Sequence, residues 1–282
     1  MLALVVAGGC ETLITPDPDD AVPVLAVDAE WTAGEGWSVQ VERTVGLNEP
    51  LDSTWVSDAT VVASGPAGQT TTFVHGTRGG YVGGGSPSAG ESYVLGVSAP
   101  GLPSVRSACT VPSPVEGLRV EGAPGGGLSV RFSDPAGRGD NYVLTLEALT
   151  ATGDTLGVVF ETDNPSIRDE SFWTAIQGSG NRATFSLAPF GDAQFDGKTF
   201  EAVIVPSVSA GTDVRSYEAL LNVGNRAYVE WWRELVTRSD ANPFAEAAVP
   251  YSNIEGGVGS LRCRTTQRAA VTLQKALVGH GS

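Results

Sequence analysis

Residues that commonly bind metals or nucleic acids are scarce in this sequence. Three Cys, two His and one Met are scattered over 282 residues, which excludes zinc fingers and iron–sulfur ligation. Lys and Arg total 17 against 32 Asp and Glu, giving a net charge of −15. Because binding to a phosphate backbone needs clustered cations, this balance argues against a nucleic-acid partner.

Glycine and proline are abundant instead, with 36 and 17 residues. Both interrupt helices, so the chain is not expected to be all-helical. Hydrophobic residues make up 41%, which suffices for a folded core, and the length fits one large or two modest domains. The sequence has no P-loop, no G-x-S-x-G and no metal-type His pair, so we expect no enzyme, no metal and no cofactor.

The first ten residues resemble a bacterial lipoprotein signal. Residues 1–9 are apolar, and small residues precede Cys10, as in signals whose cysteine receives a diacylglyceryl group. The run is short and lacks a basic start, which predicts a signal truncated by a late start codon. Residues 11–21 are acidic and contain proline, as expected of a tether between a lipid and a domain. We predict a lipid-anchored protein; the alternative is a soluble protein with an apolar start.

Short alternating runs predict an all-strand organisation from residue 22 onward. In residues 22–111 they recur every 10–20 residues between Gly/Pro-rich turns, a spacing typical of antiparallel sandwiches. Residues 111–115 form a Pro-bearing link, after which residues 112–259 resemble a fibronectin-like sandwich. The predicted fold is mainly β: two immunoglobulin/fibronectin-like antiparallel β-sandwich domains with one short C-terminal amphipathic helix.

That helix is predicted at about residues 225–238. Gly224-Asn225 offers an N-cap, and the following apolar residues have the spacing i, i+3, i+4 and i+7 of one helix face. These residues are Tyr228, Trp231, Trp232 and Leu235. We expect this face to dock on a sheet rather than to hold a ligand.

Three tryptophans of the first domain are candidate ligand-binding residues. On a surface, Trp31, Trp37 and Trp55 could stack on sugar rings, but packing in the core and at its rim is the favoured interpretation. Trp55 lies in a non-repetitive stretch and is expected to be the most exposed. In the second domain, Asp134, Asp140 and Asn141 could surround a cation, but their spacing matches no calcium loop, and a solvated turn is the favoured interpretation.

The C-terminal stretch carries the most specific motif. The Tyr/Trp-rich helix precedes NPFAEAAVPYSNIEGGVG at residues 242–259. This arrangement resembles domain of unknown function 4249, a family of Bacteroidota cell-envelope lipoproteins. LAVDAEWT (residues 25–32) and FGDAQFDGKTF (residues 190–200) resemble the family as well, so the resemblance covers about residues 10–259. The residues of the C-terminal motif are Tyr228, Trp231, Trp232, Asn242, Pro243, Phe244, Tyr251, Asn253, Gly256 and Gly257.

The resemblance implies a location rather than an activity. It implies an outer-membrane lipoprotein that accompanies a TonB-dependent transporter, and no catalytic residue carries over. The first hypothesis is therefore a non-catalytic lipoprotein that binds a ligand or partner and is anchored to the outer membrane through Cys10. The sequence does not decide between the periplasmic and the outer face of that membrane. A glycan-binding or adhesin-type module, based on the tryptophans, is the alternative. A secreted hydrolase would need paired carboxylates and is the third hypothesis.

Residues 260–282 form an atypical basic tail. The family closes with an apolar, aromatic strand, whereas residues 256–282 contain four bases and no acid. A shift of reading frame near Gly259 would explain this, and a genuine tail could form a short helix. Because Cys263 lies in the tail, we interpret Cys109 as a buried small hydrophobe. The alternative is that the two cysteines pair in an oxidising compartment.

Overall fold

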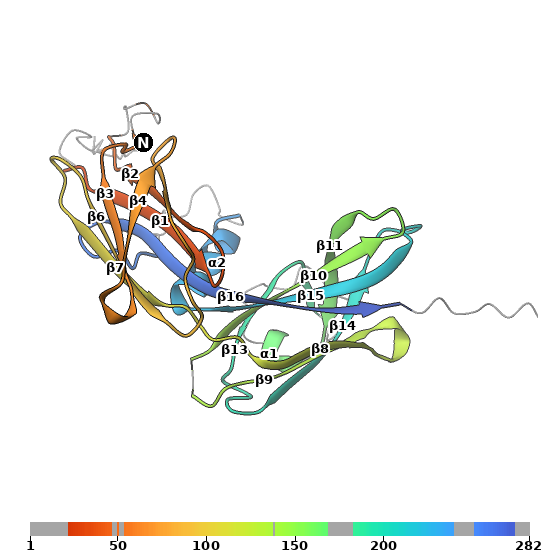
Figure 1. Ribbon diagram of the computed structural model, residues 1–282. Helices are drawn as coiled ribbons and strands as arrows, with labels where there is room; N and C mark the ends of the chain where they lie inside the picture. Colours follow the sequence, from red (N-terminus) through yellow and green to blue (C-terminus); the bar gives the residue numbers. More distant parts are fainter. Residues whose placement is uncertain are drawn as a thin grey trace, which may run out of the picture.

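The structure is a computed structural model that describes residues 22–46, 50, 54–137, 139–168, 183–239 and 251–273. It is mainly β, with two lobes that share one long strand (Figure 1). Sixteen strands of the described residues join into one hydrogen-bonded sheet, in which fourteen form a single path and β12 and β13 pair beside it with β11 and β10. The two strands at the ends of the path, β7 and β8, follow one another in sequence, so the chain passes from one lobe to the other through residues 111–115.

The N-terminal lobe contains seven strands and the beginning of β16. Its strands are β1 (Leu25–Thr32), β2 (Trp37–Arg43), β3 (Thr60–Ser64), β4 (Thr70–His75), β5 (Gly80–Gly83), β6 (Ser92–Ser98) and β7 (Val105–Thr110). Their spatial order is β7-β6-β3-β4-β5-β2-β1-β16. A short 3₁₀ turn at Pro66–Gly68 links β3 to β4. Six of the seven strands were predicted; β5 was missed because it lies in a Gly-rich stretch that has the composition of a turn.

In the residues that the structure describes, the C-terminal lobe contains eight strands, two helices and the end of β16. Its strands are β8 (Glu116–Gly122), β9 (Leu128–Ser133), β10 (Asn141–Thr150), β11 (Thr155–Thr162), β12 (Ala183–Phe185), β13 (Ala188–Gly191), β14 (Thr199–Ser207) and β15 (Val214–Gly224). The helices are α1 (Pro165–Arg168) and α2 (Arg226–Ser239). A 3₁₀ turn at Pro124–Gly126 joins β8 to β9. The predicted helix at about residues 225–238 is confirmed as α2, shifted by one residue.

Each lobe has its own hydrophobic core, because alternate residues of its strands point inward. In β1, Leu25, Val27 and Trp31 are at most 1% exposed, whereas Asp28 between them is exposed. The core of the C-terminal lobe is built on aromatic rings from β9, β10 and β14, among them Phe132, which lies 5.0 Å from Tyr142. The period of two that predicted the strands therefore also identifies the inward faces.

Strand β16 (Val258–Thr272) belongs to both lobes. Its first half pairs in parallel with β1, and its second half pairs antiparallel with β15. The change of partner occurs at Arg264, whose register neighbours are Thr32 on one side and Gly224 on the other. Among the described strands, every pairing other than β1–β16 is antiparallel.

Residues 260–272 are thus part of the fold, and the helix considered for this basic segment does not form there. The segment enters the N-terminal core because Leu261 and Cys263 alternate inward and are fully buried. The predicted end of the second domain was residue 259, whereas the second lobe continues through β16 to Thr272. The bases of the segment are paired with acids of neighbouring strands rather than left as an isolated cationic tail.

Cys109 of β7 and Cys263 of β16 form a disulfide. Their Cα atoms are 6.2 Å apart, and 154 residues separate them in sequence. The interpretation of Cys109 as an unpaired buried hydrophobe was wrong, because β16 returns to the N-terminal core, which the sequence pattern did not show. Within the described residues, no helix combines the length and apolar character needed to cross a bilayer.

Candidate binding site

The three candidate tryptophans lie in different environments. Trp31 and Trp37 are 0% and 5% exposed, and their rings meet edge to face with centroids 4.7 Å apart. The Trp31 indole nitrogen donates to the carbonyl of Ser38 at 3.1 Å. Neither indole offers a face to a ligand, so the candidate ligand-binding role is wrong for Trp31 and Trp37, and the favoured interpretation of packing in the core holds for both. They occupy inward positions of β1 and β2 and fill the core.

Trp55 is the exposed member of this set. Its side chain is 41% exposed, and the guanidinium of Arg78 lies 5.5 Å from its ring centroid. Trp55 forms an isolated antiparallel bridge with Glu42 of β2. Directly opposed residues of two strands point to the same side of a sheet, so Trp55 lies on the outer side, where Glu42 also points.

A shallow depression crosses the outer side of the N-terminal lobe. We call this surface the polar face and define it by the outward residues of β5, β2, β1 and early β16: Gly80, Val82, Ser38, Gln40, Glu42, Ala26, Asp28, Glu30 and Arg262. Two hollows, of about 450 Å³ and about 280 Å³, lie on it. Asp28 and Gln40 line both hollows, so the two are adjacent.

Ion pairs fix the charged groups of the polar face. Arg262 is 5% exposed, and its guanidinium lies 2.7 Å from Asp28 and 3.5 Å from Glu30. Arg264 contacts Glu30 at 2.7 Å and donates to the side-chain oxygen of Asn222 at 2.6 Å. These cations come from β16 and the acids from β1, so the parallel pairing of the two strands brings the charges together.

Helix α2 covers the cationic end of the polar face. The guanidinium of Arg262 lies 4.4 Å from the ring centroid of Trp231, within the range of a cation–π contact. Tyr228 and Val229 instead pack with Val143 of β10, and Trp232 packs against this cluster. The expectation that the aromatic face docks on a sheet holds for Tyr228 and Trp232, while Trp231 covers an arginine.

Asn225 fixes the start of α2. Its side-chain oxygen accepts from the backbone N–H of Tyr228 at 3.0 Å, which makes it the predicted N-cap. The same oxygen accepts from the N–H of Cys263 at 3.2 Å, and the Asn225 N–H donates to the Cys263 carbonyl at 2.9 Å. One residue therefore caps α2 and attaches it to β16. Burial raises the pKa of Tyr228, so this ring stays neutral in the junction.

The motif residues after α2 hold β16 in place. The side chain of Asn253 donates to the carbonyl of Leu261 at 3.0 Å and accepts from its N–H at 2.8 Å. Gly257 lies so close to β1 that an added Cβ would be 2.3 Å from the Leu25 carbonyl oxygen, and Gly256 has a φ of +82°. The N–H of Tyr251 donates to the carboxylate of Glu234 on α2. The motif is therefore architectural in the part that the structure describes; Asn242, Pro243 and Phe244 lie outside it, as does Cys10.

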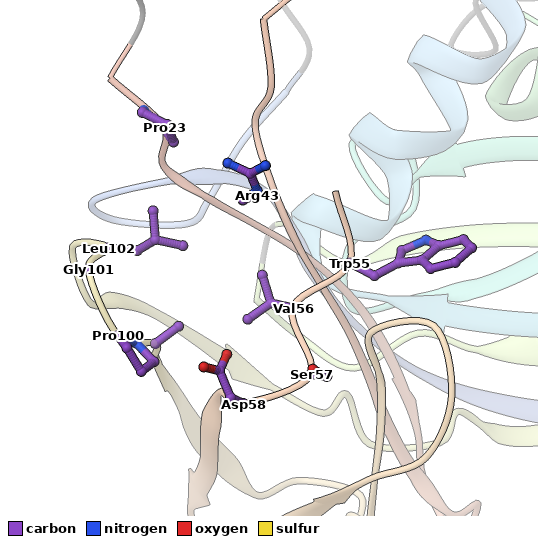
Figure 2. Close-up of a pocket in the computed structure, with 10 residues that line it drawn as sticks. Pro23, Arg43, Trp55, Val56, Ser57, Asp58, Pro100, Gly101 and Leu102 are labelled. Carbon is purple, nitrogen blue, oxygen red and sulfur yellow. The ribbon is translucent and has the colours of Figure 1, made fainter. Parts of the chain in front are cut away.

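A further hollow of about 510 Å³ lies at the end of the N-terminal lobe where the described chain begins (Figure 2). Its lining includes Pro23, Arg43, Val56, Asp58 and Leu102. The Trp55 backbone borders this hollow, but Figure 2 shows the indole directed away from the other lining residues. The indole therefore belongs to the neighbouring outer side and not to this hollow.

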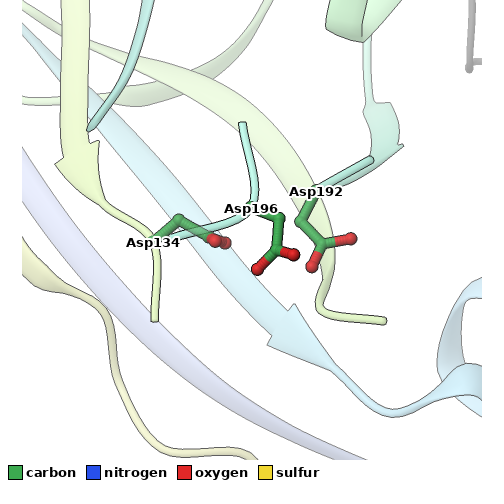
Figure 3. Close-up of side chains that lie close together, drawn as sticks. All are labelled: Asp134, Asp192 and Asp196. Carbon is green, nitrogen blue, oxygen red and sulfur yellow. The ribbon is translucent and has the colours of Figure 1, made fainter. Parts of the chain in front are cut away.

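Three aspartates of the C-terminal lobe converge where β9 and β13 end. Carboxylate oxygens of Asp134, Asp192 and Asp196 lie within 4.8 Å of one another, and Asp134 and Asp192 are only 6% and 4% exposed (Figure 3). The interpretation of Asp134 as part of a solvated turn was wrong. Asp192 and Asp196 were noticed in the sequence only as part of the family resemblance, because nothing local indicates that their loop folds against Asp134.

Hydrogen bonds from neighbouring groups satisfy these carboxylates. Asp134 accepts from the hydroxyl of Tyr142 and from the N–H of Gly197 at 2.8 Å. Asp192 accepts from the N–H of Gly139 at 3.0 Å, and Asp196 accepts from the N–H of Gly137 at 2.8 Å. The cluster thereby holds the loop between β9 and β10 against the loop after β13. Carboxylates are also the ligands that hard cations prefer, so these three residues could hold such an ion.

Burial, together with the neighbouring acids, raises the pKa of two carboxyl groups here, those of Asp134 and Asp140. Burial, reinforced by the charges of Asp134, Asp192 and Asp196, raises the pKa of Asp140 to about 6. Burial also raises the pKa of Asp134, although hydrogen bonds from Tyr142 and Gly197 oppose the shift. Paired carboxylates are what the hydrolase hypothesis requires, yet the hydrogen bonds above assign these to a structural role.

Comparison with known proteins adds one family. The model of a domain of unknown function, DUF4249, matches residues 11–268 of the chain. The match begins directly after Cys10 and extends through most of β16. A search of curated proteins finds no match.

Proposed function

The chain belongs to the DUF4249 family, and from this premise we propose that it is a non-catalytic lipoprotein of the outer membrane that binds a ligand or partner. One observation carries the proposal: the family domain starts at the residue that follows Cys10, the predicted lipid-bearing cysteine. An anchor that ends where the domain begins is the arrangement of a protein held at a membrane by its lipid. The resemblance described above adds a TonB-dependent transporter as the partner.

The proposed body of this lipoprotein is a pair of immunoglobulin/fibronectin-like sandwiches. Two separate hydrophobic cores, and pairing that is antiparallel everywhere among the described strands except between β1 and β16, support this division. A body of this kind binds through its surface, and the polar face and the hollow of Figure 2 are concave regions of that surface. Both belong to the N-terminal lobe, which follows the proposed tether at residues 11–21.

Membrane fractionation combined with labelling by a radioactive fatty acid tests the anchor. The wild-type chain is expected to carry label and to sediment with outer membranes, whereas Cys10→Ala is expected to lose both. Glu121→Gln is the control, because that side chain is exposed on the C-terminal lobe and should affect neither readout. Unlabelled wild-type protein in the soluble fraction would remove the proposal.

In-cell crosslinking tests the transporter. Cells that express the wild-type chain are expected to give a crosslinked product that contains a TonB-dependent transporter, identified by mass spectrometry. Cys10→Ala is expected to lose this product because the protein no longer reaches the membrane surface. A membrane-bound, lipid-labelled chain that yields no transporter product would leave the anchor standing and remove this partner.

A glycan-binding surface module is the second candidate function. The exposed indole of Trp55, 41% accessible beside the polar face, favours it. The buried Trp31 and Trp37 no longer contribute to this hypothesis.

A further inference from the structure

We propose that the polar face, together with the Trp55 indole at its rim, binds a neutral oligosaccharide. This inference rests on the proposed function only in taking the chain to be a binding protein. The proposed site uses the indole of Trp55 and a row of polar side chains, and not the buried Trp31 and Trp37. The site would lie across β5, β2, β1 and the first half of β16, over the two adjacent hollows.

The shape of the site follows from small residues on the outer side. Gly76 and Gly80 line the larger hollow, and Ala26 and Gly259 line the smaller one. Such residues leave the peptide backbone open to a ligand, while the longer side chains of Gln40 and Glu42 stand beside them. The result is a broad and shallow depression, which fits an oligosaccharide whose sugar rings lie flat on the sheet.

Polar groups of the site are held in fixed positions. The Gln40 amide nitrogen donates to the Arg78 carbonyl at 2.6 Å, which leaves its amide oxygen as a positioned acceptor. Asp28 is fixed by Arg262, yet 56% of its side chain stays exposed, so its carboxylate can still accept from a ligand. Pre-positioned acceptors lose little conformational entropy on binding, which favours recognition of hydroxyl groups.

The indole of Trp55 supplies an apolar surface beside these acceptors. It projects on the same side as Glu42, which lines the smaller hollow. Arg78 lies over its ring at 5.5 Å and restrains it. From the row of Trp55 and Glu42 to that of Glu30 and Arg262, strand spacing and rise give a length of roughly 15–20 Å. An indole with polar acceptors on one side matches a sugar ring, which has an apolar C–H face and hydroxyl edges.

Charge and position argue for a neutral glycan over a peptide. Asp28, Glu30 and Glu42 are balanced by Arg78, Arg262 and Arg264, so the site has no excess charge to attract an ion. The face lies in the middle of the sheet path, where β5, β2 and β1 are paired on both sides, and it therefore offers no free edge to an added strand. The hollows also lack a deep apolar pocket of the kind that anchors a protein partner, in the residues that line them.

Binding of defined oligosaccharides tests the site. The full chain with Cys10→Ser, which carries no lipid, is screened against tri- to hexasaccharides of glucose, mannose, galactose and xylose, and each hit is measured by calorimetry. Trp55→Ala is expected to weaken binding roughly tenfold, as for an interface aromatic. Asp28→Asn is expected to weaken it at least roughly threefold. Val203→Ala, an exposed apolar position of the C-terminal lobe, and Glu121→Gln should leave binding unchanged.

Each outcome decides the inference. Absence of binding to every neutral sugar, binding of basic peptides instead, or equal affinity of Trp55→Ala and wild type would overturn it, provided circular dichroism shows that the variants fold. Because the chain tested has no lipid, a failed anchor does not affect the result. Conversely, a lipid-labelled chain that binds no sugar removes this site and leaves the proposed function intact.

Discussion

Gly257 and Gly259 are required by the close approach of β16 to β1. An added Cβ at Gly257 would lie 2.3 Å from the Leu25 carbonyl oxygen, and one at Gly259 would lie 2.0 Å from that of Val27. Gly259 also has a φ of +108°, which side chains rarely adopt. Such contacts with backbone cannot be relieved by turning a side chain. The glycines of the family motif therefore select the parallel pairing that joins the lobes.

Gly257→Ala is predicted to destabilise the protein by about 2–4 kcal/mol, because β16 must move away from β1. Chemical unfolding followed by circular dichroism measures the change. Gly157→Ala is the control, since an added Cβ in that strand position meets nothing within 4 Å and φ is not positive. Equal stability of the two variants would contradict the close approach.

The aspartate cluster shows how acids distant in sequence perturb one another. Asp140 has a pKa raised to about 6, and that of Asp134 is raised as well. A raised carboxyl pKa means that the folded state holds its proton more tightly than the unfolded state does. The stability that this contributes is complete below about pH 4, and it is lost as the pH rises to about 6.

Asp140→Asn is therefore predicted to be more stable than wild type at pH 7 and to lose this advantage near pH 4. The gain should be on the order of 1 kcal/mol or less, because solvent screens a half-buried group. Unfolding free energies at both pH values provide the test. Glu35→Gln removes the same charge from an exposed turn, and a similar pH-dependent gain in that variant would rule out the cluster as the cause.

Among the elements, those with local signals were predicted and those that depend on distant partners were not. Alternation predicted most strands, and the spacing Tyr228, Trp231, Trp232 with the Asn225 cap predicted α2. Strand β16 was missed because its basic residues have the composition of a tail until Asp28, Glu30 and Glu218 are placed beside them. The polar face was missed for the same reason, since it combines β1, β2 and β5 with β16, which is far from the other three in the chain.

The disulfide links two strands, β7 and β16, that are distant in sequence. Closing a loop of 154 residues restricts the unfolded chain, and such bonds commonly contribute about 2–4 kcal/mol. Cys109→Ser is predicted to lower the unfolding midpoint and to abolish the effect of reductant on it. Thermal unfolding with and without reductant tests this, and the intact mass of the oxidised wild type reports the bond directly. A midpoint of the wild type that reductant does not change would contradict the stapling role.

At the scale of the whole molecule, β16 couples the two cores. Its residues Leu261 and Cys263 are buried in the N-terminal core, while Ala269 and Val271 pack against the C-terminal core. Helix α2 reinforces the junction through Asn225 and Trp231. A shared strand cannot leave one sheet without disturbing the other, so we expect the lobes to unfold together rather than independently.

Ala269→Pro tests this coupling. The residue pairs with Ala219 of β15 in the C-terminal lobe, and proline there removes a backbone donor from a paired strand and destabilises the pairing. Hydrogen exchange is expected to accelerate in β15 and also in β1, although β1 contacts only the other half of β16.

Ala89→Pro is the control. Ala89 follows Ser88 in a turn closed by the Glu91 N–H, a position that accepts proline, and Gly90 beyond it has a φ of +80°. If exchange rises in β15 while β1 stays protected, the two lobes are independent units, and β16 joins them without coupling their stability.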